Sequence, residues 1–105
     1  MGYHVIRTDV ADSQIRKIIL YIAEKFGGEV ALQKLDDLER AILAPADNPD
    51  IGTEPQYLVL KRQGYKVLIL EKDLVFYKVN ESRKEAIVYA VVDRRQDYIN
   101  IIRGL

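Results

Sequence analysis

The chain has 105 residues, 49% of them apolar and 30% charged, so it has room for one domain with one core and too much apolar surface for a disordered chain. It contains no cysteine, which excludes disulfides, thiolate metal sites and cysteine nucleophiles. The net charge is zero, but residues 1–56 carry 6 Lys/Arg and 10 Asp/Glu whereas residues 57–105 carry 10 and 6, which indicates either a polyanion-facing surface in the second half or a chance distribution.

The location of the protein and its dependence on cofactors are also constrained by the sequence. No apolar run approaches the roughly 20 residues that span a bilayer, and the N-terminus shows no signal-peptide pattern. A single histidine, His4, without cysteine argues against a zinc site, and there is no glycine-rich phosphate loop or Ser-His-Asp arrangement. We therefore expect one cytoplasmic domain over residues 1–105, without a membrane segment, metal or cofactor.

The first half of the chain predicts a strand followed by a helical hairpin. Residues 3–8 are rich in β-branched and aromatic side chains, which is typical of a strand. Residues 9–13 offer helix N-caps, and a buried helical stripe is predicted from the spacing of Ile15, Ile18, Ile19, Ile22, Ala23 and Phe26. Gly27-Gly28 ends this helix. A second helix, which stops before Pro45, is predicted from the stripe of Ala31, Leu35, Leu38 and Ile42.

The second half of the chain predicts an antiparallel meander. Residues 46–56 contain Asn, Pro and Gly and form a loop. Short polar turns then separate four predicted strands, at residues 57–61, 65–70, 74–79 and 85–92, and residues 96–102 form a last helical turn. The fold class is therefore α+β, ordered β-α-α-β-β-β-β, with the hairpin on one face of a mainly antiparallel sheet. Function is expected on the other face.

These elements carry motifs that resemble the RelE/ParE superfamily of toxins from type II toxin–antitoxin systems. The resemblance covers nearly the whole chain. It is carried by ADSQIRKIILYIAEKFGGEVALQKLDDLERAI in the hairpin, NPDIG in the loop, and GYKVLI, LVFYKVNE and AIVYAVVDRRQDY in the meander. The basic ending Asp93-Arg94-Arg95-Gln96-Asp97-Tyr98 is the most specific of these motifs.

The resemblance implies a plasmid-stabilisation type of toxin, held inactive by a cognate antitoxin. It leaves two activities open. RelE-like members are mRNA interferases, metal-independent endoribonucleases that cleave mRNA at the ribosome, and this is our first hypothesis. ParE-like members are gyrase inhibitors without nuclease activity, which is the second. A degenerate, non-toxic member that keeps only antitoxin binding is the third.

Cleavage of RNA by its own 2′-hydroxyl requires cations for the developing phosphorane charge and an aromatic ring that can hold a splayed base. By resemblance, Lys66 takes the place of a phosphate-binding arginine, Arg94 or Arg95 matches the C-terminal basic position, and Tyr98 matches the terminal aromatic residue. The catalytic candidates are therefore Lys66, Arg94, Arg95 and Tyr98. Lys61 and Arg62 are RNA-binding candidates, or else solvated charges before a turn. We expect all six to converge. Tyr98 is alternatively a packing anchor for the last helix.

Two departures from the nuclease pattern favour the gyrase hypothesis. Lys66 binds phosphate as a point charge without the bidentate fork of arginine. Asp93 stands where nuclease members carry a non-acidic residue; its carboxylate repels phosphate, or pairs with Arg95. The single histidine, His4, is far in sequence from the motif and is expected to be a structural or surface residue.

Antitoxin binding is common to all three hypotheses and requires exposed apolar surface. Leu20 and Tyr21 flank the stripe of the first helix, and Ile99 lies in the crowded C-terminus, so these three are the antitoxin-binding candidates. Ile101 and Ile102 are expected to complete the core instead. Without its antitoxin the chain is expected to self-associate.

Overall fold

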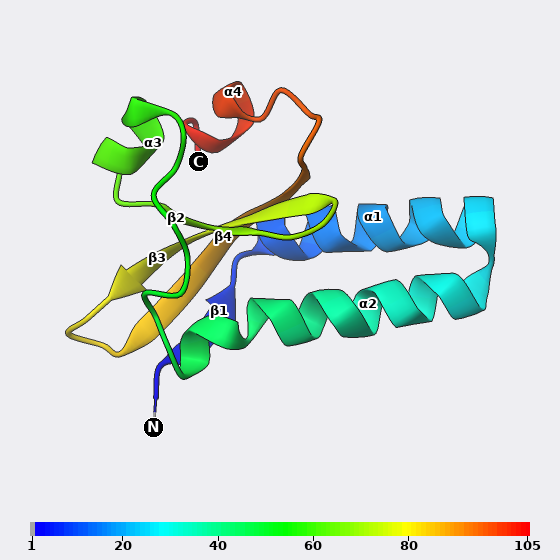
Figure 1. The fold of residues 1–105 in the computed structure, drawn as a ribbon, viewed down its shortest axis with the longest axis horizontal. Coiled ribbons are helices and arrows are strands. Elements are labelled where there is room, and N and C mark those ends of the chain that lie inside the picture. Colours follow the sequence, from blue (N-terminus) through cyan, green and yellow to red (C-terminus); the bar gives the residue numbers. More distant parts are fainter. Residues whose placement is uncertain (1) are drawn as a thin grey trace.

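A helical hairpin lies against a twisted four-stranded sheet and extends beyond it (Figure 1). The computed structural model describes residues 2–105. Its first half consists of β1 (His4–Arg7), α1 (Asp9–Phe26), α2 (Gly28–Ile42) and the short 3-10 helix η1 (Ala44–Ala46). This order confirms the prediction of a strand followed by a hairpin.

Local chemistry fixes both ends of α1. The Thr8 hydroxyl accepts a hydrogen bond from Ala11 N at 3.1 Å, which satisfies an otherwise free helical N–H. At the other end Gly27 adopts φ 94°, a conformation that glycine takes without a steric penalty, and its N–H donates to Ala23 O at 3.0 Å. In the part of the chain that the structure describes, neither α1 nor any other helix is long and apolar enough to cross a membrane.

The second half consists of α3 (Leu58–Arg62), β2 (Lys66–Ile69), β3 (Asp73–Asn80), β4 (Glu85–Asp93) and α4 (Ile99–Ile102). The strand order in the sheet is β1-β4-β3-β2. Strands β2, β3 and β4 form the predicted antiparallel meander, and β1 joins its far edge in parallel with β4. The predicted α+β class and the mainly antiparallel sheet are therefore confirmed.

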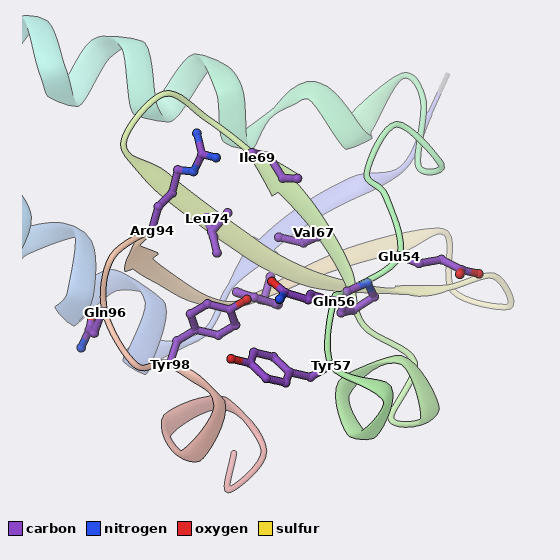
Figure 2. Close-up of a pocket in the computed structure, with 11 residues that line it drawn as sticks. Glu54, Gln56, Tyr57, Val67, Ile69, Leu74, Arg94, Gln96 and Tyr98 are labelled. Atoms are coloured by element: carbon purple, nitrogen blue, oxygen red, sulfur yellow. The ribbon is translucent and has the colours of Figure 1, made fainter.

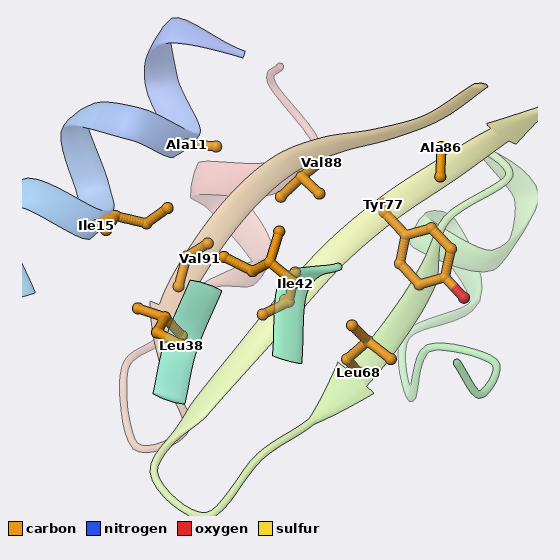
Figure 3. Close-up of a cluster of buried hydrophobic side chains, with 10 residues drawn as sticks. Ala11, Ile15, Leu38, Ile42, Leu68, Tyr77, Ala86, Val88 and Val91 are labelled. Atoms are coloured by element: carbon orange, nitrogen blue, oxygen red, sulfur yellow. The ribbon is translucent and has the colours of Figure 1, made fainter. Parts of the chain in front are cut away.

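The hairpin and the sheet enclose a first hydrophobic core, shown in Figure 3. Ile15 of α1 and Leu38 and Ile42 of α2 are buried there, as their spacing predicted. The prediction for Phe26 is wrong, because α1 extends beyond the sheet and leaves the Phe26 side chain 65% exposed.

A second core lies on the opposite face of the sheet, beneath α3 and α4. It is formed by Leu60, Tyr65, Val67, Leu74, Phe76, Ala90, Val92 and Ile102. Because β3 is covered on both faces, its sequence is apolar at every position from Leu74 to Tyr77. The face on which we expected function is therefore partly filled by short helices.

The predicted strand over residues 57–61 is wrong, because this segment forms α3. A short apolar run has no decisive period, so tertiary packing determines its conformation. Only Leu60 of α3 is buried, whereas Leu58 and Val59 are exposed. The following turn is correct, since Gly64 adopts φ 91°. The meander consequently has three strands rather than four.

A β-bulge in β4 determines which of its side chains reach the second core. The pairing steps from Phe76↔Ala90 to Tyr77↔Val88, so Tyr89 has no partner in β3. As a result Tyr89 and Ala90, although consecutive, both pack on the second core, and Val91 returns to the first.

Candidate functional site

The second face of the sheet carries a pocket of about 360 Å³, which we call the aromatic pocket (Figure 2). Three segments that are distant in sequence line it. They are residues 54–57 of the loop before α3, the strand residues Val67, Ile69, Leu74 and Phe76, and the C-terminal residues Arg94, Gln96 and Tyr98. The pocket therefore has an apolar floor and a polar rim.

Tyr98 forms the aromatic wall of this pocket together with Tyr57. Their rings meet edge to face with centroids 5.6 Å apart, and the Tyr98 ring also packs 5.2 Å from that of Phe76. Burial raises the pKa of the Tyr98 phenol, and Tyr57 raises it further. The phenol therefore stays protonated at neutral pH. Tyr98 thus packs beside the last helix and also lines the pocket.

Arg94 is placed at the rim by the turn between β2 and β3. Its Nη1 donates to the carbonyl oxygens of Leu70 and Glu71, both at 3.3 Å, and its backbone N donates to Lys72 O at 3.0 Å. The guanidinium is thus held in one orientation beside the pocket. Among residues 2–105, the side-chain hydrogen bonds of Arg94 are made by Nη1, and Nε and Nη2 make none.

Arg95 is not part of the pocket and pairs with Asp93. Its Nε and Nη2 donate to the two carboxylate oxygens of Asp93 at 3.2 and 3.3 Å, and its backbone N donates to the first of them at 2.8 Å. These bonds lower the pKa of Asp93, with the Arg95 side chain as the largest cause. The pairing that the sequence suggested is therefore present at the surface, where the Arg95 side chain is 90% exposed.

The Asp93 carboxyl should consequently titrate below its ordinary pKa, and Arg95→Gln should move its midpoint back up. A carbon-detected NMR titration of the aspartate side chains measures this directly. Arg94→Gln is the matched control, because Arg94 bonds to carbonyl groups and not to Asp93. An Asp93 midpoint that is the same in the native protein and in Arg95→Gln would show that the pair does not form in solution.

Lys66 does not converge with Arg94 and Tyr98. It is paired opposite Tyr77, and directly opposed residues of antiparallel strands project to the same face of the sheet. Tyr77 belongs to the first core, so Lys66 lies on the hairpin face, where its Nζ is 3.4 Å from an Asp50 carboxylate oxygen. The expected cluster of cations is therefore divided between two faces of the sheet.

Lys61 and Arg62 also lie outside the aromatic pocket, in the last turn of α3. The ammonium of Lys61 is 3.0 Å from a Glu54 carboxylate oxygen. Arg62 is exposed, with no ion pair within residues 2–105. Of the six candidates, only Arg94 and Tyr98 share the pocket.

The three predicted antitoxin-binding residues differ in accessibility. Leu20 and Tyr21 are 60% and 57% exposed on α1. Ile99 is half-buried against the second core, and the fully buried Ile102 completes that core as expected. Ile101 remains 37% exposed, so the expectation that it completes the core is not met.

A general base and a metal site were also sought among residues 2–105. His4 lies at the exposed start of β1, on the far edge of the sheet from β2. No cluster of three or more His, Asp or Glu side chains in the described part of the chain could hold a metal ion. Among its polar groups the aromatic pocket offers Arg94, the phenols of Tyr57 and Tyr98, and the Glu54 carboxylate.

Comparison with known families matches residues 5–98 to the model of the ParE toxin of the type II toxin–antitoxin system, parDE. The chain belongs to the ParE toxin family. No curated protein sequence matches it. ParE membership agrees with the hairpin, the meander and the basic C-terminal motif, which all fall within or at the border of the matched range.

Solved structures share this ParE fold at low sequence identity. A chain of the chromosomal ParDE system of Pseudomonas aeruginosa aligns with a TM-score of 0.73 and 18% identity, covering 88% of this chain and 96% of that one. A chain of the RelBE2 toxin–antitoxin complex of Mycobacterium tuberculosis gives 0.65 and 14%, covering 90% and 100%. A doubly substituted RelE of Escherichia coli in the free state gives 0.55 and 14%, covering 99% and 96%.

Sequence reasoning assigned Arg94 and Tyr98 to the site and missed the other residues that line the pocket, among them Glu54, Tyr57 and Phe76. The first two fall where a loop and a strand were predicted, so their side chains had no assigned direction. Phe76 lay on a strand with two apolar faces. One signal in the sequence could have indicated an aromatic site. Tyr57 precedes the meander and Tyr98 follows it.

Proposed function

We propose that this ParE-family chain is a toxin that inhibits DNA gyrase by binding, without cleaving RNA. The observation that carries the proposal is the separation of the predicted cations. Lys66 and Arg95 are engaged by Asp50 and Asp93, and neither lines the aromatic pocket. A phosphorane-stabilising cluster needs its cations around one phosphate. The family match supports the same reading.

Ribosome-dependent mRNA cleavage is the second candidate, and one observation favours it. Arg94 and Tyr98 line the same pocket, so a phosphate and a stacked base could occupy it together. Among the described lining residues, the carboxylate of Glu54 at the rim is the one group suited to accept the proton of the 2′-hydroxyl. The ribosome would have to supply the remaining groups.

Two assays on the same purified toxin separate these activities. We expect micromolar toxin to inhibit supercoiling by gyrase, and to leave mRNA without new 5′ ends in a translation reaction read by primer extension. DNA topoisomerase I serves as the control for general interference with DNA, and its relaxation activity should not change. Ribosome-dependent cleavage that disappears in Arg94→Ala would replace our proposal with the nuclease. Inactivity of the folded protein in both assays would favour the third hypothesis, a non-toxic member that keeps only antitoxin binding.

The proposed function includes an antitoxin partner. Two of the structural neighbours are a parDE system and a RelBE2 toxin–antitoxin complex. The exposed Leu20 and Tyr21 supply apolar surface for such a partner, with the accessible part of Ile99 as a further contact. The same exposed surface is expected to promote self-association when the antitoxin is missing.

A further inference from the structure

Five aromatic side chains form a continuous line across the second face of the sheet, which we call the aromatic row. Consecutive rings have their centroids 5.2 to 6.2 Å apart. From end to end the aromatic row consists of Tyr89, Tyr65, Phe76, Tyr98 and Tyr57. Three of its four contacts are edge to face, so neighbouring rings hold one another in place. The aromatic pocket lies at the Tyr57 end of this row (Figure 2).

The opposite end of the aromatic row encloses the ammonium group of Lys78. Its Nζ lies 4.5 Å from the centroid of the Tyr65 ring and 5.1 Å from that of the Tyr89 ring, and the two rings are perpendicular. The negative faces of aromatic rings attract a cation. Because the Lys78 side chain is also half-buried, its ammonium is held at a defined place on the second face.

The chain does not supply an acidic partner for this ammonium. Among residues 2–105, none of the ion pairs involves Lys78. Glu85 of the neighbouring strand β4 pairs instead with Arg83, whose Nε lies 3.3 Å from a Glu85 carboxylate oxygen. Burial raises the pKa of the Tyr65 phenol, so this group carries no charge at neutral pH. A carboxylate for Lys78 therefore has to come from a partner.

An apolar strip lies beside Lys78 on the same face of the sheet. The register pairs Lys78 of β3 with Ile87 of β4, and Ile87 with Ile6 of β1. Residues paired on neighbouring strands project to the same face, so these three side chains lie in one line across the sheet. Both isoleucines are only half-buried. A ligand that reaches the ammonium therefore meets apolar surface beside it.

A carboxylate carried by an apolar protein segment matches this combination of groups. The two rings already exclude water from part of the Lys78 ammonium, so a carboxylate that covers the remainder displaces little further hydration. A nucleic-acid backbone fits less well, because its binding depends on several cations and on ring faces free to stack with bases. Here the ring faces are engaged by neighbouring rings. Tyrosine is, in contrast, enriched among the dominant residues of protein interfaces.

We propose that gyrase presents an acidic side chain, flanked by apolar residues, to Lys78, and that the target contact extends along the aromatic row from the aromatic pocket to this ammonium. The inference rests on the proposed function for the identity of the target. It adds an electrostatic contact at Lys78, which lies outside the residues that line the pocket.

Inhibition of supercoiling by substituted toxins tests the role of the Lys78 charge. Lys78→Met keeps the length of the side chain but removes the charge, and we expect the half-inhibitory toxin concentration to rise about tenfold. Lys78→Arg keeps a cation that packs on ring faces, and should stay within about threefold of the native protein. Lys84→Met is the matched control, since Lys84 Nζ lies 5.1 Å from the Tyr3 centroid in the turn between β3 and β4, and it should inhibit like the native protein.

The possible results separate this inference from the proposed function. Equal inhibition by Lys78→Met and the native protein would overturn the inference and leave the gyrase proposal intact. Equal losses in Lys78→Met and Lys78→Arg, both folded by circular dichroism, would assign Lys78 to packing and not to a charged contact. A native protein that does not inhibit gyrase would overturn the proposed function together with this contact. Loss of ribosome-dependent cleavage in Lys78→Met would assign the surface to RNA.

Acetylation of lysines in the native protein provides a test without substitution. The toxin is treated with an N-hydroxysuccinimide ester of acetate, alone and with saturating gyrase, and each lysine is read by mass spectrometry. We expect the modification of Lys78 to fall at least about threefold in the complex, because the centre of an interface excludes solvent, whereas that of Lys84 should not change. Unchanged modification of Lys78 in an inhibited complex would contradict the contact. Protection by the cognate antitoxin and not by gyrase would assign Lys78 to the antitoxin and overturn the inference.

Discussion

Replacing Gly52 with alanine is expected to lower the free energy of unfolding by about 2–4 kcal/mol. A Cβ atom at this position would lie 2.7 Å from the Tyr77 hydroxyl, 2.8 Å from a Tyr77 ring carbon and 3.0 Å from Val67 O. Tyr77 is fully buried and Val67 O belongs to the strand backbone, so neither can move aside cheaply.

The substitution would also disturb the hydrogen bonds that hold the loop before α3. Gly52 N donates to the Tyr77 hydroxyl at 2.9 Å, and this hydroxyl donates to Pro49 O at 2.7 Å. Burial raises the pKa of Tyr77, so the hydroxyl keeps its proton and remains a donor. If Cβ pushes the ring away, a buried hydroxyl loses its partners.

Gly28→Ala is the matched control for this prediction. An added Cβ at Gly28 meets nothing within 4 Å, and this residue opens α2. We expect a change of less than about 1 kcal/mol there, in the stabilising direction if the position behaves as helical. Urea denaturation of both variants, followed by circular dichroism, gives the comparison. Equal stabilities would mean that the loop relaxes around the new methyl group.

The Gly52 contact matters for function because the same loop carries one wall of the aromatic pocket. Glu54 and Tyr57 follow Gly52 within a few residues, and both line that pocket. Tyr77 lies on the opposite face of the sheet, yet its hydroxyl holds the start of this segment. A stable Gly52→Ala protein with weakened target inhibition would therefore locate the target contact on this wall.

The hairpin could be predicted from sequence because its apolar residues recur at helical spacing and because glycine marks the end of its first helix. Ile15, Leu38 and Ile42 repeat at helical spacing, and Gly27 marks the turn between the helices. The segment 57–61 has none of these features, and its helix depends on the burial of Leu60 beneath the C-terminal residues. Local pattern determines an element only where it outweighs such tertiary contacts.

The candidate site was predicted less well than the fold, because the face of the sheet on which each side chain lies could not be predicted. Neighbouring strands bring residues close in space, but a side chain's face depends on a register that the sequence does not reveal. Lys66 and Val67 illustrate this, because the second lines the aromatic pocket and the first lies on the hairpin face. The bulge at Tyr89 also shifts by one residue the alternation of β4 side chains between the two faces of the sheet, before the chain reaches Arg94.

Lys34→Met is expected to destabilise the fold by about 2–3 kcal/mol, at the lower end of the cost of breaking a buried ion pair. Lys34 of α2 binds the Asp73 carboxylate at 2.5 Å, and the Asp73 side chain is only 5% exposed. Methionine keeps the length of the side chain but leaves this carboxylate without a partner. The Lys34 side chain is 24% exposed, so water can reach the unpaired Asp73 carboxylate and limits the loss of stability.

Two comparisons isolate this effect by urea denaturation. Lys61→Met breaks an exposed pair with Glu54, whose side chain is 72% exposed, and should cost less than about 1 kcal/mol. The double variant Lys34→Met with Asp73→Leu removes both buried charges and should recover most of the stability. If it is no more stable than Lys34→Met alone, the loss comes from packing and not from the unpaired carboxylate.

The Lys34–Asp73 pair lies at a junction between two parts of the fold. It joins the hairpin to the turn between β2 and β3, and the carbonyl groups of the same turn hold Arg94 from the other side. The ion pair requires the Lys34 ammonium to lie beside the Asp73 carboxylate, whereas apolar contacts would not specify which side chains meet at this junction. Selective loss of target inhibition in the otherwise stable double variant would assign the pair to positioning the pocket rim.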